Sequence, residues 1–129
     1  MKSAPAMLAA DFQPSDGPYL VKLMSTETLI ILCTCPDDEV AASLSHQLVE
    51  QGLAACINRF GGLTSVYKWD GEMKEGTEVQ LVIKTSAQAV VRLIDELQRL
   101  HPYELPEIIA IPISAGFAPY LEWIRESTT

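Results

Sequence analysis

The segment TSVYKWDGEMKEGTEVQLVIK, residues 64–84, contains two strand-like runs on either side of an Asp70-Gly71 pair. Asp-Gly is a preferred tight reversal between antiparallel strands. On the far side of the reversal, the apolar odd-numbered positions from 79 to 83 share one face, as in a strand with one buried side. Both arms exceed the usual strand of about five or six residues. The segment therefore predicts a long hairpin that extends beyond the body of the monomer and offers an unpaired edge to another subunit.

The residues before this hairpin predict one strand, one helix and the start of a second strand. Residues 28–34 form an unbroken apolar run, which is typical of a strand covered on both faces. After Pro36, acidic residues at 37 and 38 favour a helix start, and Gly52 favours a left-handed helix end. Apolar character resumes at 54–59, and we expect Gly61-Gly62 to interrupt it before the hairpin.

The residues after the hairpin predict a second helix, a last strand and a short terminal helix. Thr85 or Ser86 can cap the second helix, whose apolar positions keep a period near 3.6 until Pro102 ends it. Residues 108–113 are strand-like and β-branched. Pro119 can begin the terminal helix, one side of which is lined by apolar and aromatic residues.

This order of elements predicts an α+β fold of the ferredoxin-like, split βαβ type, with a long β-hairpin and a C-terminal helix. Two helices cover one face of a four-stranded sheet in this fold. The other face would be exposed in an isolated copy, and Val82 and the hairpin aromatics make it apolar. Burial against sister chains is the simplest way to cover such a face, so we expect a closed homo-oligomer.

The length of 129 residues predicts one domain, which we place at 27–129. The run of Pro, Ser, Asp and Gly at 14–18 predicts a flexible tail at 1–26. Its short apolar stretch is too weak for a secretory signal, and a processed organellar leader is the alternative. Seventeen acidic and nine basic residues give a net charge of −8, which disfavours nucleic acid as a partner. No apolar run approaches the roughly 18 residues that a membrane span needs. Three cysteines are an odd number, which favours a reducing compartment and hence the cytoplasm.

Several ordered motifs resemble the CutA divalent-cation tolerance family over residues 27–127. The resemblance implies a ferredoxin-like monomer in a tight trimer, joined by edge-strand pairing, with a cleft between adjacent subunits. It also implies a link to copper and other divalent metals and a similarity of shape to PII-type signal transducers. The motifs are LAACIN at 53–58, TSVYKWDG at 64–71, Glu78-Val79 with Lys84-Thr85, HPYELPEI at 101–108, Gly116, and Tyr120-Leu121 with Trp123-Ile124.

The resemblance aligns Cys33 with a cysteine that recurs at the end of the first strand and is associated with copper. Thiolates and imidazoles suit copper and zinc. We therefore predict a metal site in which Cys33 or Cys35 joins His101 and Glu107 across strands or subunits. No obligatory cofactor is expected, and copper or another divalent metal is the candidate ion. The alternative is that Cys33 and Cys56 are small buried apolar residues, because no C-x-x-C or H-x-x-H spacing supports a preformed site.

The motif HPYELPE at 101–107 holds four titratable side chains between two prolines, so we expect an ordered connection. His101 falls at the end of the second helix, where the helix dipole favours a protonated imidazole. Its alternative role is to cap that helix. Glu104 and Glu107 could share a cation, although Leu105-Pro106 separates them.

A second candidate site is an intersubunit cleft that would take a small anion or a carboxylated metabolite. The alternative for its two aromatic residues is a place in the trimer core, and the alternative for its lysine is a salt bridge to Glu78 or Glu107. The predicted cleft residues are Tyr67, Trp69, Lys84, Glu104 and Tyr120.

Enzymatic motifs are missing from the sequence, so we predict no catalytic residues and no enzyme. There is no G-x-S-x-G and no phosphate-binding glycine loop, and His46 is expected on a solvated helix face. An acid-base pair of His101 and Glu107 would rest on fold analogy alone. Three functions stay open: a trimeric copper-binding tolerance protein, a PII-like ligand sensor or adaptor, and a structural trimer that binds its partner on the outside.

Overall fold

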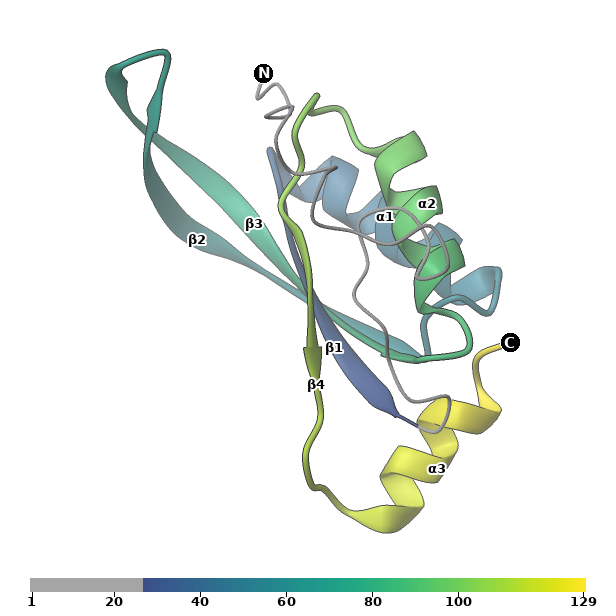
Figure 1. Cartoon of the computed structure of the whole chain (residues 1–129). Helices are drawn as coiled ribbons and strands as arrows, with labels where there is room; N and C mark the ends of the chain where they lie inside the picture. Colours follow the sequence, from purple (N-terminus) through teal and green to yellow (C-terminus); the bar gives the residue numbers. More distant parts are fainter. Residues whose placement is uncertain (1–26) are drawn as a thin grey trace.

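The computed structural model describes residues 27–129, so the predicted tail at 1–26 lies outside the described residues. The described residues form four strands and three helices in the order that the sequence predicted, and Figure 1 labels each of them. The elements are β1 (Thr28–Cys35), α1 (Asp38–Glu50), β2 (Cys56–Trp69), β3 (Glu72–Ser86), α2 (Val90–Leu100), β4 (Ile108–Pro112) and α3 (Ala118–Glu126).

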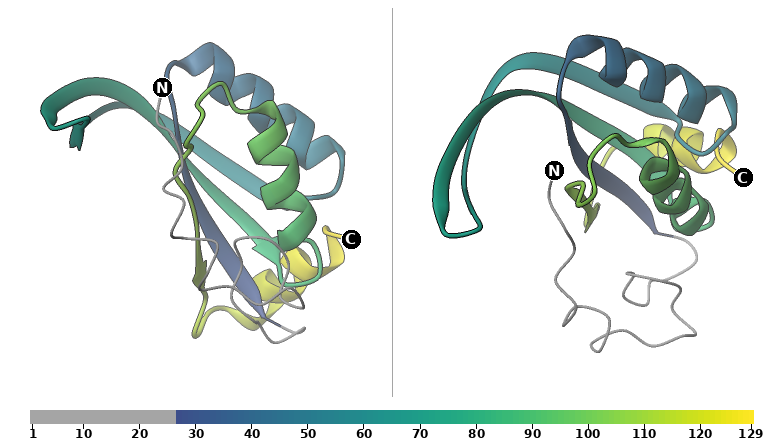
Figure 2. Two further views of the ribbon diagram at one scale, coloured as in Figure 1. Left: turned by 45° about the horizontal axis from the view of Figure 1, so that its top comes forward. Right: turned by 90° about the horizontal axis from the view of Figure 1, so that it is seen from above.

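The strands form one antiparallel sheet in the order β2-β3-β1-β4. The predicted α+β fold with a long hairpin is therefore confirmed for the single chain. Helices α1 and α2 cover one face of the sheet, and α3 lies at the end of the molecule away from the hairpin tip (Figures 1 and 2). Within the described residues, no helix is long and apolar enough to cross a membrane.

The core lies between the sheet and the two helices that cover it. Alternate residues of β1 and β3 point into this core, because successive side chains of a strand face opposite ways. Val79, Leu81 and Ile83 are buried there as predicted, while Gln80 and Val82 on the other face are half-buried. The largest buried apolar side chains are Leu29, Ile31, Leu48, Leu81, Ile83, Leu93, Leu97 and Ile124.

The hairpin of β2 and β3 curves away from the body of the molecule (Figure 2). Asp70 and Gly71 form its reversal with φ values of 51° and 79°, which confirms the predicted turn. The expected interruption at Gly61-Gly62 is wrong. Instead β2 runs through these residues with a shift of register between Phe60 and Leu63, and Gly62 takes a φ of 81°. Glycine accommodates such a bulge without ending the strand.

The ends of α1 agree with the sequence prediction. The side chain of Asp37 accepts a hydrogen bond of 2.9 Å from the backbone N–H of Val40, as an N-cap does. Gly52 follows the C-cap residue Gln51 with a φ of 73°, the left-handed conformation that closes many helices.

The predicted cap of α2 is wrong, because Thr85 and Ser86 are the last residues of β3. The hydroxyl of Thr85 donates to the backbone carbonyl of Leu53 at 2.7 Å, and that of Ser86 pairs with the hydroxyl of Thr128 at 2.7 Å. Both groups are therefore already engaged in tertiary contacts. Helix α2 begins after Ala89, which gives it no side-chain cap.

Candidate metal centre

Cys33, Cys35 and His101 lie together in the core at the end of β1. One potential ligand atom of each lies within 4.8 Å of the others, and all three residues are buried. Cys33 and Cys35 are two residues apart on one strand, so both side chains point to the helix-covered face. Both are 0% exposed. His101 is brought to them because it is the C-cap of α2, where its backbone N–H donates to the carbonyl of Leu97 at 2.8 Å.

The imidazole of His101 is held at both ring nitrogens by backbone groups. Its Nδ1 accepts a hydrogen bond of 3.1 Å from the backbone N–H of Tyr103. A nitrogen that accepts from an amide carries no proton, so the ring is neutral and Nε2 donates to the carbonyl oxygen of Thr34, at 2.8 Å. The expectation of a protonated imidazole, based on the helix dipole, is therefore wrong. The amide of Tyr103 needs an unprotonated Nδ1, and this local contact decides the tautomer.

Tyr103 ties the same connection to the hairpin strand β3. Its hydroxyl donates to the carboxylate of Glu78 at 2.8 Å, and its ring centroid lies 4.8 Å from that of His101. Both Tyr103 and Glu78 are buried, and burial, followed by this hydrogen bond, raises the pKa of Tyr103. Sequence reasoning gave Glu78 only an alternative role as a salt-bridge partner of Lys84 and gave Tyr103 none, although the proline-flanked motif at 101–107 indicated an ordered connection.

The two thiols differ in the ease with which each loses a proton. The pKa of Cys35 is lowered from 9.0 to about 6 by a hydrogen bond from Cys33 and, further, by one with His101, while burial opposes this shift. The pKa of Cys33 is raised by its hydrogen bond with Cys35, then by burial, and then by the negative charges of Cys35, Glu107 and Glu78. The pair therefore gives up one proton easily and the second with difficulty. All three cysteines of the chain are free.

Residues 29–127 match the family model of the CutA1 divalent ion tolerance protein. The chain belongs to this family. It is 46% identical over 99 residues to the divalent-cation tolerance protein CutA of Thermus thermophilus, and this match covers 77% of this chain and 96% of the relative. It is 43% identical over 95 residues to protein CutA of Homo sapiens. That match covers 74% of this chain and only 53% of the longer human protein.

Solved structures of the CutA1 family have the same fold as this chain. The structure of the Thermus thermophilus divalent cation tolerance protein matches with a TM-score of 0.77 and 45% identity, over 79% of this chain and 99% of that one. The structure of CutA1 from Oryza sativa matches with a TM-score of 0.78 and 35% identity, and the match covers 80% of this chain and 94% of that one. The family description names divalent ion tolerance.

Glu107, which the sequence predicted to join the cysteines and His101 across strands or subunits, lies outside this cluster within one CutA1 chain. It is exposed, and its charge raises the pKa of Cys33. Cys35, which the sequence left as an alternative to Cys33, joins it in the same group. The cluster within one CutA1 chain thus contains two sulfurs and one imidazole, and no carboxylate from the described residues.

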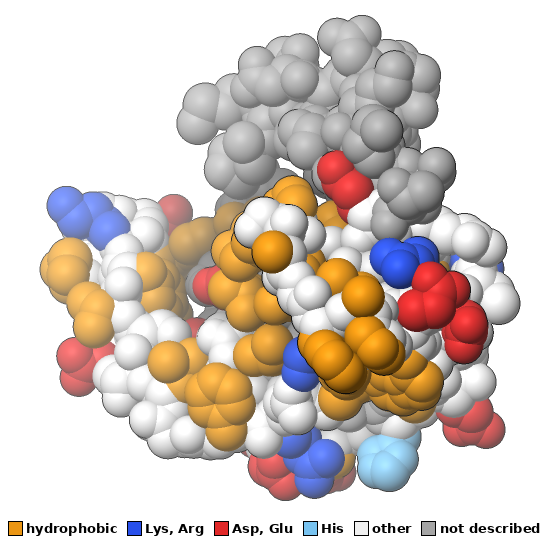
Figure 3. All heavy atoms as spheres, turned by 90° about the horizontal axis from the view of Figure 1, so that it is seen from below, with side chains coloured by type: hydrophobic (Ala, Val, Ile, Leu, Met, Phe, Trp, Pro, Cys, Tyr) orange, Lys and Arg blue, Asp and Glu red, His pale blue; other side chains and the backbone are white. Residues whose placement is uncertain are grey.

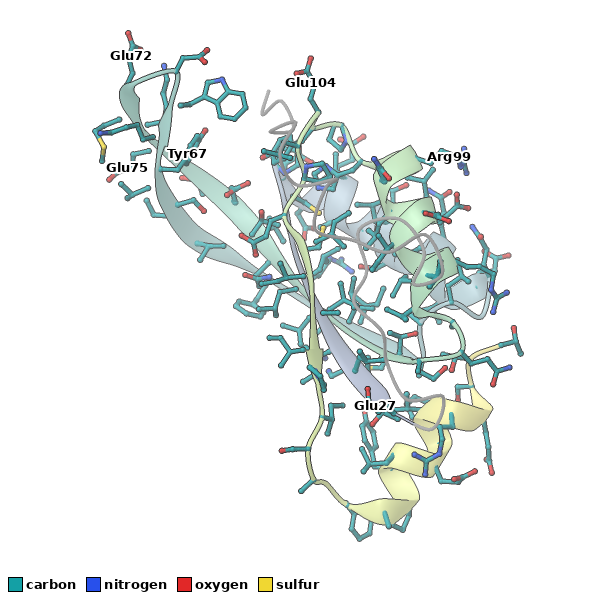
Figure 4. The ribbon with its side chains drawn as sticks, viewed as in Figure 1. Glu27, Tyr67, Glu72, Glu75, Arg99 and Glu104 are labelled. Atoms are coloured by element: carbon teal, nitrogen blue, oxygen red, sulfur yellow. The ribbon has the colours of Figure 1, made fainter. Side chains whose placement is uncertain are left out.

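The predicted cleft residues of this CutA1 chain fall into two groups. Tyr67 and Trp69 are half-buried on one face of the hairpin, and Figure 4 shows Tyr67 and Glu104 toward the hairpin end of the molecule. Lys84 lies in the body of the sheet opposite Cys56. Burial, and then the interaction with Cys56, raise the pKa of Tyr120 on α3. A cleft that joins the two groups between subunits stays a prediction.

Lys84 has a different partner from the one that the sequence suggested. Its Nζ donates to the side-chain oxygen of Asn58 on the neighbouring strand. Neither Glu78 nor Glu107 forms an ion pair with it, and no other carboxylate of residues 27–129 does so. His46 is exposed on α1, as predicted.

Proposed function

We propose that this CutA-family chain is a trimeric, cytoplasmic protein of metal tolerance that binds copper through the buried Cys33, Cys35 and His101 cluster. The observation that carries the proposal is the approach of two thiols and one imidazole to within 4.8 Å of one another. Sulfur and imidazole are the donors that copper prefers. The relatives in Thermus thermophilus and Pectobacterium atrosepticum are named divalent-cation tolerance proteins, which supports the same assignment.

Metal binding at this cluster requires a local rearrangement, because the two cysteines are 0% exposed. The connection from His101 to Tyr103 covers the site and is held by two side-chain hydrogen bonds, one to Thr34 and one to Glu78. An ion that enters replaces the thiol protons, so binding releases protons and weakens at low pH. The site therefore couples metal uptake to movement of this connection.

The proposed trimer accounts for the face of the sheet that no helix covers. Ile109 and Ile111 of β4 are 50% and 44% exposed there. Large apolar side chains continue at the α3 end, where Figure 3 shows orange side chains gathered across the surface. They include Phe117, Tyr120 and Trp123. An exposed apolar surface of this kind favours burial against identical copies.

Calorimetric titration tests the metal proposal. Wild type should bind Cu(I) or Cu(II) saturably, Cys33→Ser should lose that binding, and His101→Ala should weaken it. Cys56→Ser is the matched control, because Cys56 is a free cysteine outside the cluster. Absence of saturable copper binding by the wild type would contradict the proposal.

A second candidate function, a PII-like sensor of small anions, is favoured by Lys84. This half-buried lysine pairs with no carboxylate of residues 27–129, in a chain of 17 acidic residues. An anionic ligand at the predicted intersubunit cleft would supply the missing charge. In a thermal-shift screen of nucleotides and carboxylated metabolites, a specific ligand should stabilise wild type more than Lys84→Met. A screen in which only metals raise the melting temperature would exclude this function.

A further inference from the structure

We propose that the ion taken by this site is monovalent and thiophilic, Cu(I) or its analogue Ag(I), held between the thiolates of Cys33 and Cys35. The inference rests on the proposed function and specifies its cargo. In the binding step, two metal–sulfur bonds form, and any proton still bound to the sulfur of Cys33 or Cys35 leaves to solvent as its S–H bond breaks. No change of oxidation state is involved.

The two sulfurs are close enough together to bind a single ion placed between them. Cys33 and Cys35 share one face of β1, and the ligand atoms of the cluster lie within 4.8 Å of one another. A metal–sulfur bond is about 2.3 Å long, so two sulfurs on opposite sides of one ion stand at most about 4.6 Å apart. The 4.8 Å limit therefore puts both sulfurs within reach of one ion, and rotation of the two side chains can set the final spacing with the strand backbone unchanged.

The histidine of the cluster is already engaged, which limits the resting ligand set to the two sulfurs. His101 Nδ1 accepts from the amide of Tyr103, and its Nε2 donates to the carbonyl of Thr34. To ligate a metal, the ring would have to give up one of these hydrogen bonds, which would leave a buried backbone group unsatisfied. Two-coordinate binding by sulfur alone is chemistry of soft d¹⁰ ions such as Cu(I) and Ag(I).

Divalent ions would lack ligands at the same place. Zn²⁺ takes four ligands in nearly all structural sites, and harder ions require oxygen donors. Among residues 27–129, no carboxylate joins the group formed by Cys33, Cys35 and His101. Both sulfurs are 0% exposed, so solvent water is not at hand to complete a larger shell. The ligand set and its burial therefore select against divalent cations.

The experiment compares Cu(I), Ag(I), Zn(II) and Cu(II) on the full chain, with chromophoric chelators as competitors under anaerobic conditions. We expect one Cu(I) or Ag(I) per chain, with Zn(II) and Cu(II) bound at least about 100-fold more weakly. Cys35→Ser should weaken the binding of Cu(I) by a similar factor, whereas Cys56→Ser should leave the affinity for Cu(I) unchanged. X-ray absorption of the Cu(I) form should show two sulfur neighbours and no nitrogen.

The possible outcomes separate this inference from the proposed function. If Zn(II) or Cu(II) binds at the cluster as tightly as Cu(I), the choice of ion is overturned and metal binding stands. If Cys35→Ser binds Cu(I) like wild type, or a nitrogen neighbour is present, the two-thiolate site is overturned. If no metal binds at all, the proposed function itself fails. Circular dichroism of each variant, with Cys35→Ala as a second substitution, distinguishes lost binding from lost folding.

Discussion

The ring Nε2 of His101 lies 2.8 Å from the backbone carbonyl oxygen of Thr34, the residue between the two buried cysteines of β1. This contact joins the connection after α2 to the end of the strand that carries both thiols. It places the imidazole beside the sulfurs and at the same time occupies one of its two ring nitrogens. The packing of this connection against β1 and the access of a metal to the two sulfurs therefore both depend on the side chain of His101.

His101→Ala should lower the free energy of unfolding by about 2 kcal/mol, because it removes the donor to Thr34 and the acceptor for the Tyr103 amide, both buried. Urea unfolding followed by circular dichroism measures the change. His46→Ala is the matched control, since His46 is exposed on α1 and should change stability by less than about 0.5 kcal/mol. Equal effects of the two substitutions would show that the His101 contacts do not stabilise the fold.

Tyr103→Phe should change how stability depends on alkaline pH. The pKa of Tyr103 is raised above its ordinary value of 10.0 by burial and by the bond to Glu78. The folded state thus holds the phenolic proton more tightly than the unfolded state does. Its contribution is complete below about pH 10 and is lost as the pH rises further.

Unfolding curves measured from neutral pH to above pH 10 test this prediction. At neutral pH the Tyr103→Phe variant should be less stable by about 1–3 kcal/mol, because the bond to the Glu78 carboxylate is lost. Above about pH 10, wild type should lose stability more steeply than the variant. Parallel curves over the whole range would mean that the phenol titrates alike in both states.

Asp37→Ala should destabilise the chain by about 1 kcal/mol, since it removes the side-chain acceptor for the Val40 N–H at the start of α1. Asp37→Asn keeps an oxygen acceptor at that position and should retain most of the stability. Thermal unfolding at neutral pH separates the two variants. If Asp37 acts as a cap, the stability of Asp37→Asn should be close to that of wild type. A loss of stability as large as that of Asp37→Ala would show that the charge of Asp37 matters instead.

Ile109→Lys should convert the proposed trimer to smaller species, because it places a charge on the apolar sheet face that sister chains would cover. Val49→Lys is the control, since Val49 is 43% exposed on α1, away from that face. Size-exclusion chromatography with light scattering gives the mass of each. Wild type and Val49→Lys should run as trimers, and a monomeric wild type would contradict the proposed assembly.

The fold was predictable from the sequence where local chemistry and tertiary packing agree. The Asp70-Gly71 reversal, the Asp37 cap and the alternation of β3 each follow from a short-range pattern, and each is present. Thr85 and Ser86 were misassigned because their hydroxyls bond to Leu53 and Thr128, which lie far away along the chain. Such contacts carry no local pattern.

The candidate site was predictable in part for the same reason. Cys33 and His101 were identified from the sequence, and the i, i+2 spacing on a strand places Cys35 on the same face as Cys33. The neutral tautomer of His101 depends on the amide of Tyr103, and only the fold of the connection shows this contact. Glu107 was predicted as a ligand because it lies in the motif at 101–107, and its exposed position within one chain leaves it outside the cluster.

The metal content of the untagged protein, purified without chelator under reducing conditions, tests the central claim most directly. Elemental analysis of wild type should find copper at about one atom per chain, as expected of a soft dithiol site. The Cys33→Ser, Cys35→Ser double variant should lose that copper while Cys56→Ser keeps it. Copper-free wild type from copper-supplemented cells, or a double variant with unchanged copper, would contradict the account.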